Sequence, residues 1–127
     1  MSIQKDRKKD QGSKGLENIG KFSVSFNIED IKHDFINKTN KNFKISREEF
    51  INQAFKLHSK GNFSEAIKYY QYFIAQGFLD HRVFSNYGVI LKNLGKSKEA
   101  EVLLRKAIQI NPNFADAYSN LGIILKD

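Results

Sequence analysis

The sequence predicts an all-α protein, a right-handed α-solenoid built from antiparallel helix pairs. The first observation is an internal repeat, because HRVFSNYGVILKN at 81–93 realigns on ADAYSNLGIILKD at 115–127 with six of 13 positions identical. This shift of 34 residues also joins Gly61 to Gly95 and Ala66 to Ala100. A fixed period of this length is typical of stacked helical hairpins. We expect about two and a half such units after a partly disordered N-terminal segment.

The composition is the second observation. One Pro with 11 Phe and 5 Tyr in 127 residues suits a helical protein whose helices pack through aromatic rings. The lack of Cys excludes disulfides and a thiol nucleophile. No apolar run reaches the length of a membrane span, and no apolar stretch follows the charged N-terminus as it would in a secretory signal. We therefore predict a cytoplasmic protein that does not enter a membrane.

A net charge of +7 is a feature of many proteins that bind nucleic acid. Lys outnumbers Arg 17 to 4, and residues 61–127 carry 8 basic and 6 acidic groups, so the repeat region is nearly neutral. These counts argue against a nucleic-acid partner. An RNA-binding adaptor that uses the basic tail is kept as a third interpretation of the function.

The N-terminal segment divides into two parts. Residues 1–21 are polar and Lys-rich and are expected to form a disordered basic tail, since they cannot bury enough apolar surface to offset chain entropy. Within 22–45, residues 22–26 alternate between apolar residues and Ser, which is a weak strand pattern.

A short helix is expected from Ile28 to about Asn37, capped by Asn27, with Ile31 and Phe35 in its apolar stripe. A polar linker follows at 38–44. The helix either docks on the first repeat or serves as a linear motif for a partner, and the sequence leaves both possibilities open.

The repeat domain, 46–127, carries helix-start and turn signals. Ser46 with Glu49 fits a capping box, and Asn62 with Glu65 is expected to cap the next helix. Gly61 suits the tight turn between them. The expected helices are 47–59 and 63–76 in the first unit (47–80), 82–94 and 97–110 in the second (81–114), and one that starts near 114 in the partial third (115–127).

The second unit supplies Phe84, Gly88, Leu91, Gly95, Ala100, Ala107 and Pro112. This spacing of large and small residues resembles the tetratricopeptide repeat (TPR) family. The first unit departs from the pattern, because Phe73 and Phe78 stand where the second unit has Ala107 and Pro112, and we expect Phe73 to splay that junction. The resemblance covers about 47–127 and implies a protein-binding solenoid whose first helices line a concave face.

Three asparagines recur at the repeat period, Asn52, Asn86 and Asn120. An amide offers a donor and an acceptor, as an extended peptide backbone does. The sequence AYSNLG around Asn120 is similar to the repeats of the O-linked N-acetylglucosamine transferase superhelix, where such asparagines hold peptide backbone. The alternative is that the amides bond structurally between neighbouring helices.

Apolar and basic residues lie beside these asparagines at helical spacing. Phe55, Val89 and Ile123 form the apolar positions, and His58, Lys92 and Lys126 the basic ones. A peptide with acidic or apolar side chains would suit this face, although a solvated helix face is the other interpretation. The predicted peptide-binding groove comprises Asn52, Phe55, Arg82, Asn86, Val89, Lys92, Asn120, Ile123 and Lys126.

No catalytic machinery is expected. The histidines His33, His58 and His81 have no metal-ligand spacing with carboxylates and form no triad, and no Gly-rich phosphate loop stands between a strand and a helix. We predict a protein that is not an enzyme and has no metal site and no cofactor.

The helix near the end of the chain has apolar residues that lack a partner helix, among them Leu121, Ile124 and Leu125. Either the chain is part of a longer array, or two chains pair through this helix as a homodimer. The predicted function is a protein–protein interaction module that binds an extended peptide of a partner in its concave groove. The alternative is the substrate-recognition array of a larger enzyme, such as a glycosyltransferase or another transferase.

Overall fold

The computed structural model describes residues 28–39 and 46–126, and every regular element in these two ranges is an α-helix. The expected disordered tail at 1–21, the strand pattern at 22–26 and the cap at Asn27 lie outside the described residues. The all-α prediction is therefore confirmed as a helical repeat for the part of the chain that the structure describes. The helices are α2 (Ile28–Thr39), α3 (Arg47–Ser59), α4 (Phe63–Ala75), α5 (His81–Asn93), α6 (Ser97–Ile110) and α7 (Ala115–Lys126).

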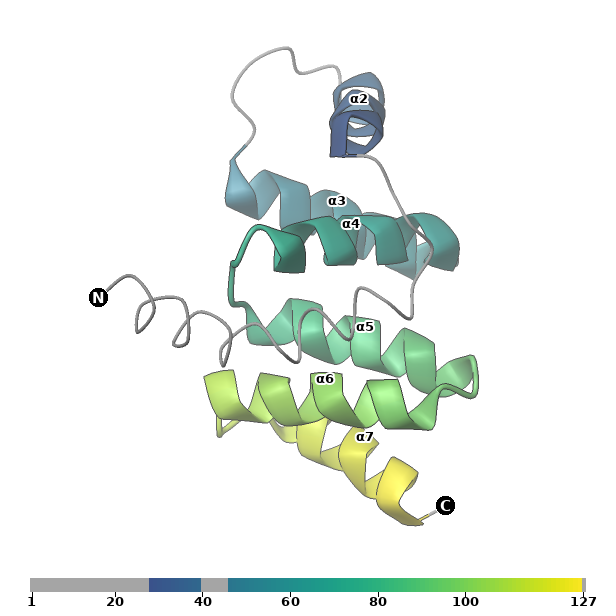
Figure 1. Cartoon of the computed structure of the whole chain (residues 1–127), viewed down its shortest axis with the longest axis vertical. Coiled ribbons are helices and arrows are strands. Elements are labelled where there is room, and N and C mark those ends of the chain that lie inside the picture. The colour runs from purple at the N-terminus through teal and green to yellow at the C-terminus, as the bar shows by residue number, and fades with distance from the viewer. Residues whose placement is uncertain (1–27, 40–45, 127) are drawn as a thin grey trace, which may run out of the picture.

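The helices form a stack in chain order (Figure 1). α3 packs on α4 and α5 packs on α6 as two helical hairpins, and α7 lies against α6 and α5. Gly61 and Gly95 make the two hairpin turns with φ of 81° and 82°, a left-handed conformation that costs glycine little. Among residues 28–39 and 46–126, no helix has the length and hydrophobicity that a bilayer crossing requires.

One of the two caps predicted within the repeat domain forms its side-chain hydrogen bond. The amide of Glu49 donates to Ser46 Oγ at 3.1 Å, as the capping box predicts. Asn62 stands at the predicted N-cap position of α4, but its side chain makes no cap hydrogen bond. Its backbone amide donates instead to the Leu57 carbonyl at 2.9 Å, so the hairpin turn sets the conformation of this residue. The expected partner in that box, Glu65, forms an ion pair with Lys38 of α2.

α2 docks on the first hairpin, which decides between the two possibilities that the sequence left open. Phe35 is fully buried, and its ring centroid lies 5.5 Å from that of Phe50. The Tyr69 hydroxyl donates to Asp34 Oδ2 at 2.6 Å, and Lys38 pairs with Asp34. Aromatic packing and a small polar network together hold α2 over this end of the stack.

The core holds more aromatic rings at the first hairpin, which buries Phe50, Tyr69, Tyr70 and Phe73, than at the second, which buries Phe84 and Tyr87. Phe73, which departs from the repeat pattern, is buried and packs on Phe78 with ring centroids 5.3 Å apart. The two residues of the first unit that differ from the repeat pattern, Phe73 and Phe78, therefore pack on each other. In the second hairpin, Gly88 lets α6 approach α5 closely, because a Cβ atom there would lie 3.0 Å from Leu104 Cγ.

Candidate functional site

The nine residues predicted to line a groove come from α3, α5 and α7, and we call their surface the α3–α5–α7 face. Asn52 and Ile123 are exposed, Lys126 is exposed at the end of α7, and the six others are partly buried. The three asparagines differ in what their amides contact, and this difference is the main result of the structure at this face.

Asn120 is held by α5 and by its own helix. Lys92 Nζ donates to Asn120 Oδ1 at 2.9 Å, and Asn120 Nδ2 donates to the Asp116 carbonyl at 2.9 Å. The first bond joins α5 to α7 across 28 residues of sequence. Two residues of the predicted groove thus bind each other directly.

Asn86 is held through a tyrosine. Its side chain shares a hydrogen bond with the Tyr70 hydroxyl, which also lies 3.0 Å from His58 Nδ1. Burial raises the pKa of Tyr70, and the bond with Asn86 offsets part of that rise. Burial lowers the pKa of His58, so the neutral ring is favoured in the folded protein. This network joins α3, α4 and α5.

The two junctions have corresponding residues. His58 and Lys92 are 34 residues apart, as are Asn86 and Asn120, so in each case a basic side chain of one helix reaches the asparagine of the next. The link is direct for Lys92 and passes through Tyr70 for His58. At these two positions the amides bond within the protein, whereas Asn52 is exposed on α3.

Arg82 also joins neighbouring helices. Its guanidinium donates to Asp80 at 2.7 Å and to Glu48 at 3.2 Å, and it lies 5.5 Å from the centroid of the Phe55 ring. Burial alone would raise the pKa of Asp80, but the hydrogen bonds from the Arg82 side chain and backbone hold that pKa below its ordinary 3.8. Arg82 is therefore engaged by two carboxylates and a ring.

The apolar part of the face lies beside these links. Val89 is half-buried on α5, and Ile123 on α7 leaves 47% of its surface exposed. Lys126 stands near Ile123, one turn further along α7. Because α5 contacts α7, these side chains belong to neighbouring helices of one surface.

Three residues that matter here were not among the predicted groove residues: Tyr70, Glu48 and Asp80. A signal for Glu48 existed, because it lies 34 residues before Arg82 and carries the opposite charge at the corresponding position. Asp80 immediately precedes α5 and caps it by accepting from the Arg82 amide at 2.9 Å. Tyr70 lies on α4, and its hydroxyl reaches this face only because α4 packs against α3 and α5.

Groups of three or more His, Cys, Asp or Glu side chains that could hold a metal ion do not occur among the described residues. The arrangement provides hydrogen-bond donors and acceptors, a few exposed apolar side chains and a cation. This chemistry suits the binding of another chain.

Comparison with known proteins supports the helical repeat. A family model of the TPR repeat matches residues 88–127, from the middle of α5 through α6 and α7. No curated protein and no solved structure matches the chain significantly. The match supports the resemblance drawn from the repeat and points to a class of helical repeat that generally serves as an interaction module.

Proposed function

We propose that the chain is a TPR protein that binds an extended peptide segment of a partner protein on its α3–α5–α7 face. The TPR match over 88–127 supports the general class, since repeats of this kind build binding surfaces from stacked helices. The features of the face itself support the more specific assignment.

The observation that carries the proposal is the combination of exposed and half-buried groups on neighbouring helices. Val89 and Ile123 offer apolar contacts on α5 and α7, and Lys126 adds a positive charge beside Ile123. A peptide that bears an apolar side chain next to a carboxylate would complement these groups. The proposed ligand is therefore a short extended segment with both features.

The asparagines would have unequal roles in this binding. Asn52 is exposed and presents a donor and an acceptor to a peptide backbone. Asn86 and Asn120 already bond to Tyr70 and Lys92, so their contribution is to hold the helices at the spacing that the ligand requires. Asn52 would contact the peptide backbone, and Val89 and Ile123 would select its side chains.

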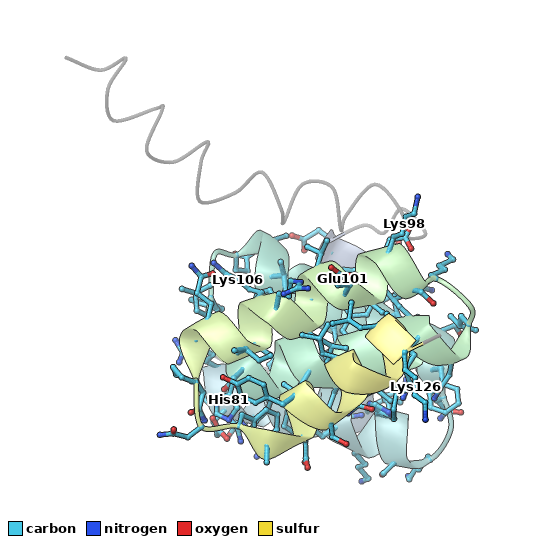
Figure 2. All side chains as sticks on the ribbon, turned by 90° about the horizontal axis from the view of Figure 1, so that it is seen from below. His81, Lys98, Glu101, Lys106 and Lys126 are labelled. Carbon is cyan, nitrogen blue, oxygen red and sulfur yellow. The ribbon has the colours of Figure 1, made fainter. Side chains whose placement is uncertain are left out.

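The test is a selection of displayed peptides of random sequence on the full chain, followed by fluorescence anisotropy with the selected peptides. Val89→Glu should weaken binding by about tenfold or more, because it places a carboxylate where an apolar or acidic group must bind. Asn52→Ala should weaken it less. Lys98→Glu is the control, since Lys98 is exposed on α6 and lies outside the face (Figure 2).

Amide shifts in a ¹⁵N NMR spectrum would locate the peptide. The proposal expects the largest shifts at α5 and α7 residues of the α3–α5–α7 face. Selected peptides that shift only the exposed surfaces of α4 and α6, or that bind Val89→Glu as tightly as the natural chain, would contradict it.

A further inference from the structure

A histidine of α3 stands at the position that the next unit fills with lysine. His58 and Lys92 are 34 residues apart, and each is the penultimate residue of its helix. Lys92 donates to Asn120 directly, whereas Tyr70 lies between His58 and Asn86. A lysine is positively charged at neutral pH, but a histidine carries a charge only after it takes up a proton. The first junction is therefore a titratable version of the second.

The surroundings of His58 favour the neutral ring in the free chain. From α4, the Phe63 and Tyr70 rings pack against it with centroids 5.6 Å and 6.1 Å away. Tyr70 is the titratable group of these two, and burial raises its pKa, so the phenol is neutral. The charged side chains that α5 adds to the face, Arg82 and Lys92, are cations. Burial lowers the pKa of His58, and no carboxylate offsets that effect.

The hydrogen bonds of the Tyr70 hydroxyl can accommodate both charge states of His58. His58 Nδ1 lies 3.0 Å from this hydroxyl, and the bond with Asn86 opposes the effect of burial on the Tyr70 pKa, as a donor to the phenol oxygen does. A neutral ring with its proton on Nε2 accepts from Tyr70 at Nδ1. A protonated ring donates there, so the hydroxyl turns to accept from His58 and to donate to the Asn86 carbonyl oxygen. Protonation thus reverses these bonds and leaves each side chain in its place.

We propose that a second carboxylate of the bound peptide pairs with the protonated His58 ring, so that binding takes up a proton and becomes tighter as the pH falls. This contact rests on the proposed function of the α3–α5–α7 face, where Lys126 binds the first carboxylate two units away. Nε2 is the ring atom available to the peptide, because Nδ1 meets Tyr70. An ionised carboxylate within hydrogen-bond distance favours the charged ring and supplies the anion that the free chain lacks.

The affinity should change between two pKa values of His58. In the free chain burial holds this pKa below 6.5, and the carboxylate raises it in the complex. Above the value in the complex, the ring is neutral in both states and the affinity is lowest. Below the value in the free chain, the ring is charged in both states and the affinity is highest. Between the two values, each peptide that binds brings in up to one proton.

The test uses peptides selected by display on the full chain at pH 5.5, with dissociation constants measured by fluorescence anisotropy at pH 5.5 and 7.5. The natural chain should bind at least about fivefold more tightly at pH 5.5. His58→Lys gives the first junction the residue of the second, so it should bind at pH 7.5 as tightly as the natural chain does at pH 5.5. His58→Gln stays uncharged and should bind at both pH values as weakly as the natural chain does at pH 7.5.

The other two histidines of the chain provide matched controls. His33→Gln and His81→Gln should keep the pH dependence, because His33 is exposed on α2 and His81 packs on Phe114 at the start of α5. A peptide in which every Asp and Glu is replaced by Asn and Gln should lose the pH dependence on the natural chain. Isothermal titration calorimetry in two buffers of different ionisation enthalpy should count up to one proton taken up per peptide, and none for either His58 variant.

Equal affinity of the natural chain at pH 5.5 and 7.5 would overturn the inference, and so would a pH dependence that persists in both His58 variants. In either case the peptide still binds, so the proposed function of the face stands. A selection that yields no peptide for this face contradicts the proposed function and the His58 contact together. Circular dichroism at both pH values checks that each chain is folded, and the amidated peptide tests the contact without any change to the protein.

Discussion

Lys92 Nζ lies 2.9 Å from Asn120 Oδ1 and joins α5 to α7 by a hydrogen bond from a charged donor. One repeat earlier, His58 reaches Asn86 through the Tyr70 hydroxyl. Lys92 thus binds the asparagine of the next unit directly, whereas Tyr70 lies between His58 and Asn86. The period that places asparagines along one face also places His58 and Lys92 near them, but not Tyr70, which stands where the second hairpin has Leu104.

Removing the Lys92–Asn120 bond should destabilise the chain modestly. We expect Asn120→Ala and Lys92→Met each to lower the free energy of unfolding by about 1 kcal/mol, because the bond is partly buried and has a charged donor. Urea denaturation of the two variants and of the double variant measures this. The double variant should lose less than the sum, and full additivity would show that the bond contributes nothing. Lys98→Met is the control on an exposed surface.

Stability should fall as the pH drops below about 6.5, the ordinary pKa of histidine. Burial lowers the pKa of His58 in the folded chain, so the unfolded chain binds this proton more readily. The stabilisation is complete above the unfolded pKa and is lost as the pH falls through the folded value. His58→Gln should flatten this part of the Tm profile between about pH 7.5 and 5.

His33→Gln is the control for that profile, since His33 is exposed on α2. It should leave the slope of Tm against pH as it is in the natural chain. An unchanged slope in His58→Gln would mean that other groups cause the pH dependence.

The two glycines at corresponding positions should respond oppositely to alanine. In Gly88→Ala the new methyl group lies 3.0 Å from Leu104 Cγ and 3.4 Å from the Ala100 carbonyl oxygen, so we expect a loss of about 1 kcal/mol. In Gly122→Ala the methyl group meets nothing within 4 Å, so helix propensity should stabilise the chain by up to about 1 kcal/mol. Thermal denaturation at low protein concentration compares them, and equal effects would contradict the packing described for α5 and α6.

Asp80 should stabilise α5 in two separable ways. Asp80→Ala removes both the N-cap and the pairing with Arg82, and we expect it to cost about 1–2 kcal/mol. Asp80→Asn keeps a capping oxygen and should cost less. Because the folded pKa of Asp80 is lowered, its contribution is present above about pH 4 and is lost as the pH falls. The acid limb of the stability profile should therefore be shallower in Asp80→Asn, and an identical limb would count against the pairing.

Much of the fold could be predicted from local sequence signals. The expected helices at 47–59 and 97–110 have the bounds that the structure shows, and 82–94 differs by one residue at each end. Glycine turns, the Ser46 cap and the aromatic spacing all act within a few residues of where they stand. Such signals can be interpreted without knowledge of the distant contacts.

The candidate site was less predictable, because its hydrogen bonds join residues far apart in sequence. Asn62 has the residue type of a cap, yet the turn governs its conformation, and Glu65 pairs with Lys38 instead. Arg82 was expected as a groove cation, and its partners Asp80 and Glu48 became evident only in the folded chain.

The sequence by itself determined the helices, their order and the period that places asparagines on one face, because helix propensity, turn residues and apolar spacing are local properties. The tertiary structure alone decided what Asn86 and Asn120 bind and that α2 covers one end of the stack. The physical reason is that several groups could form a hydrogen bond with a polar side chain such as Asn120. Only the packing of α5 against α7 brings Lys92 within hydrogen-bond distance of it.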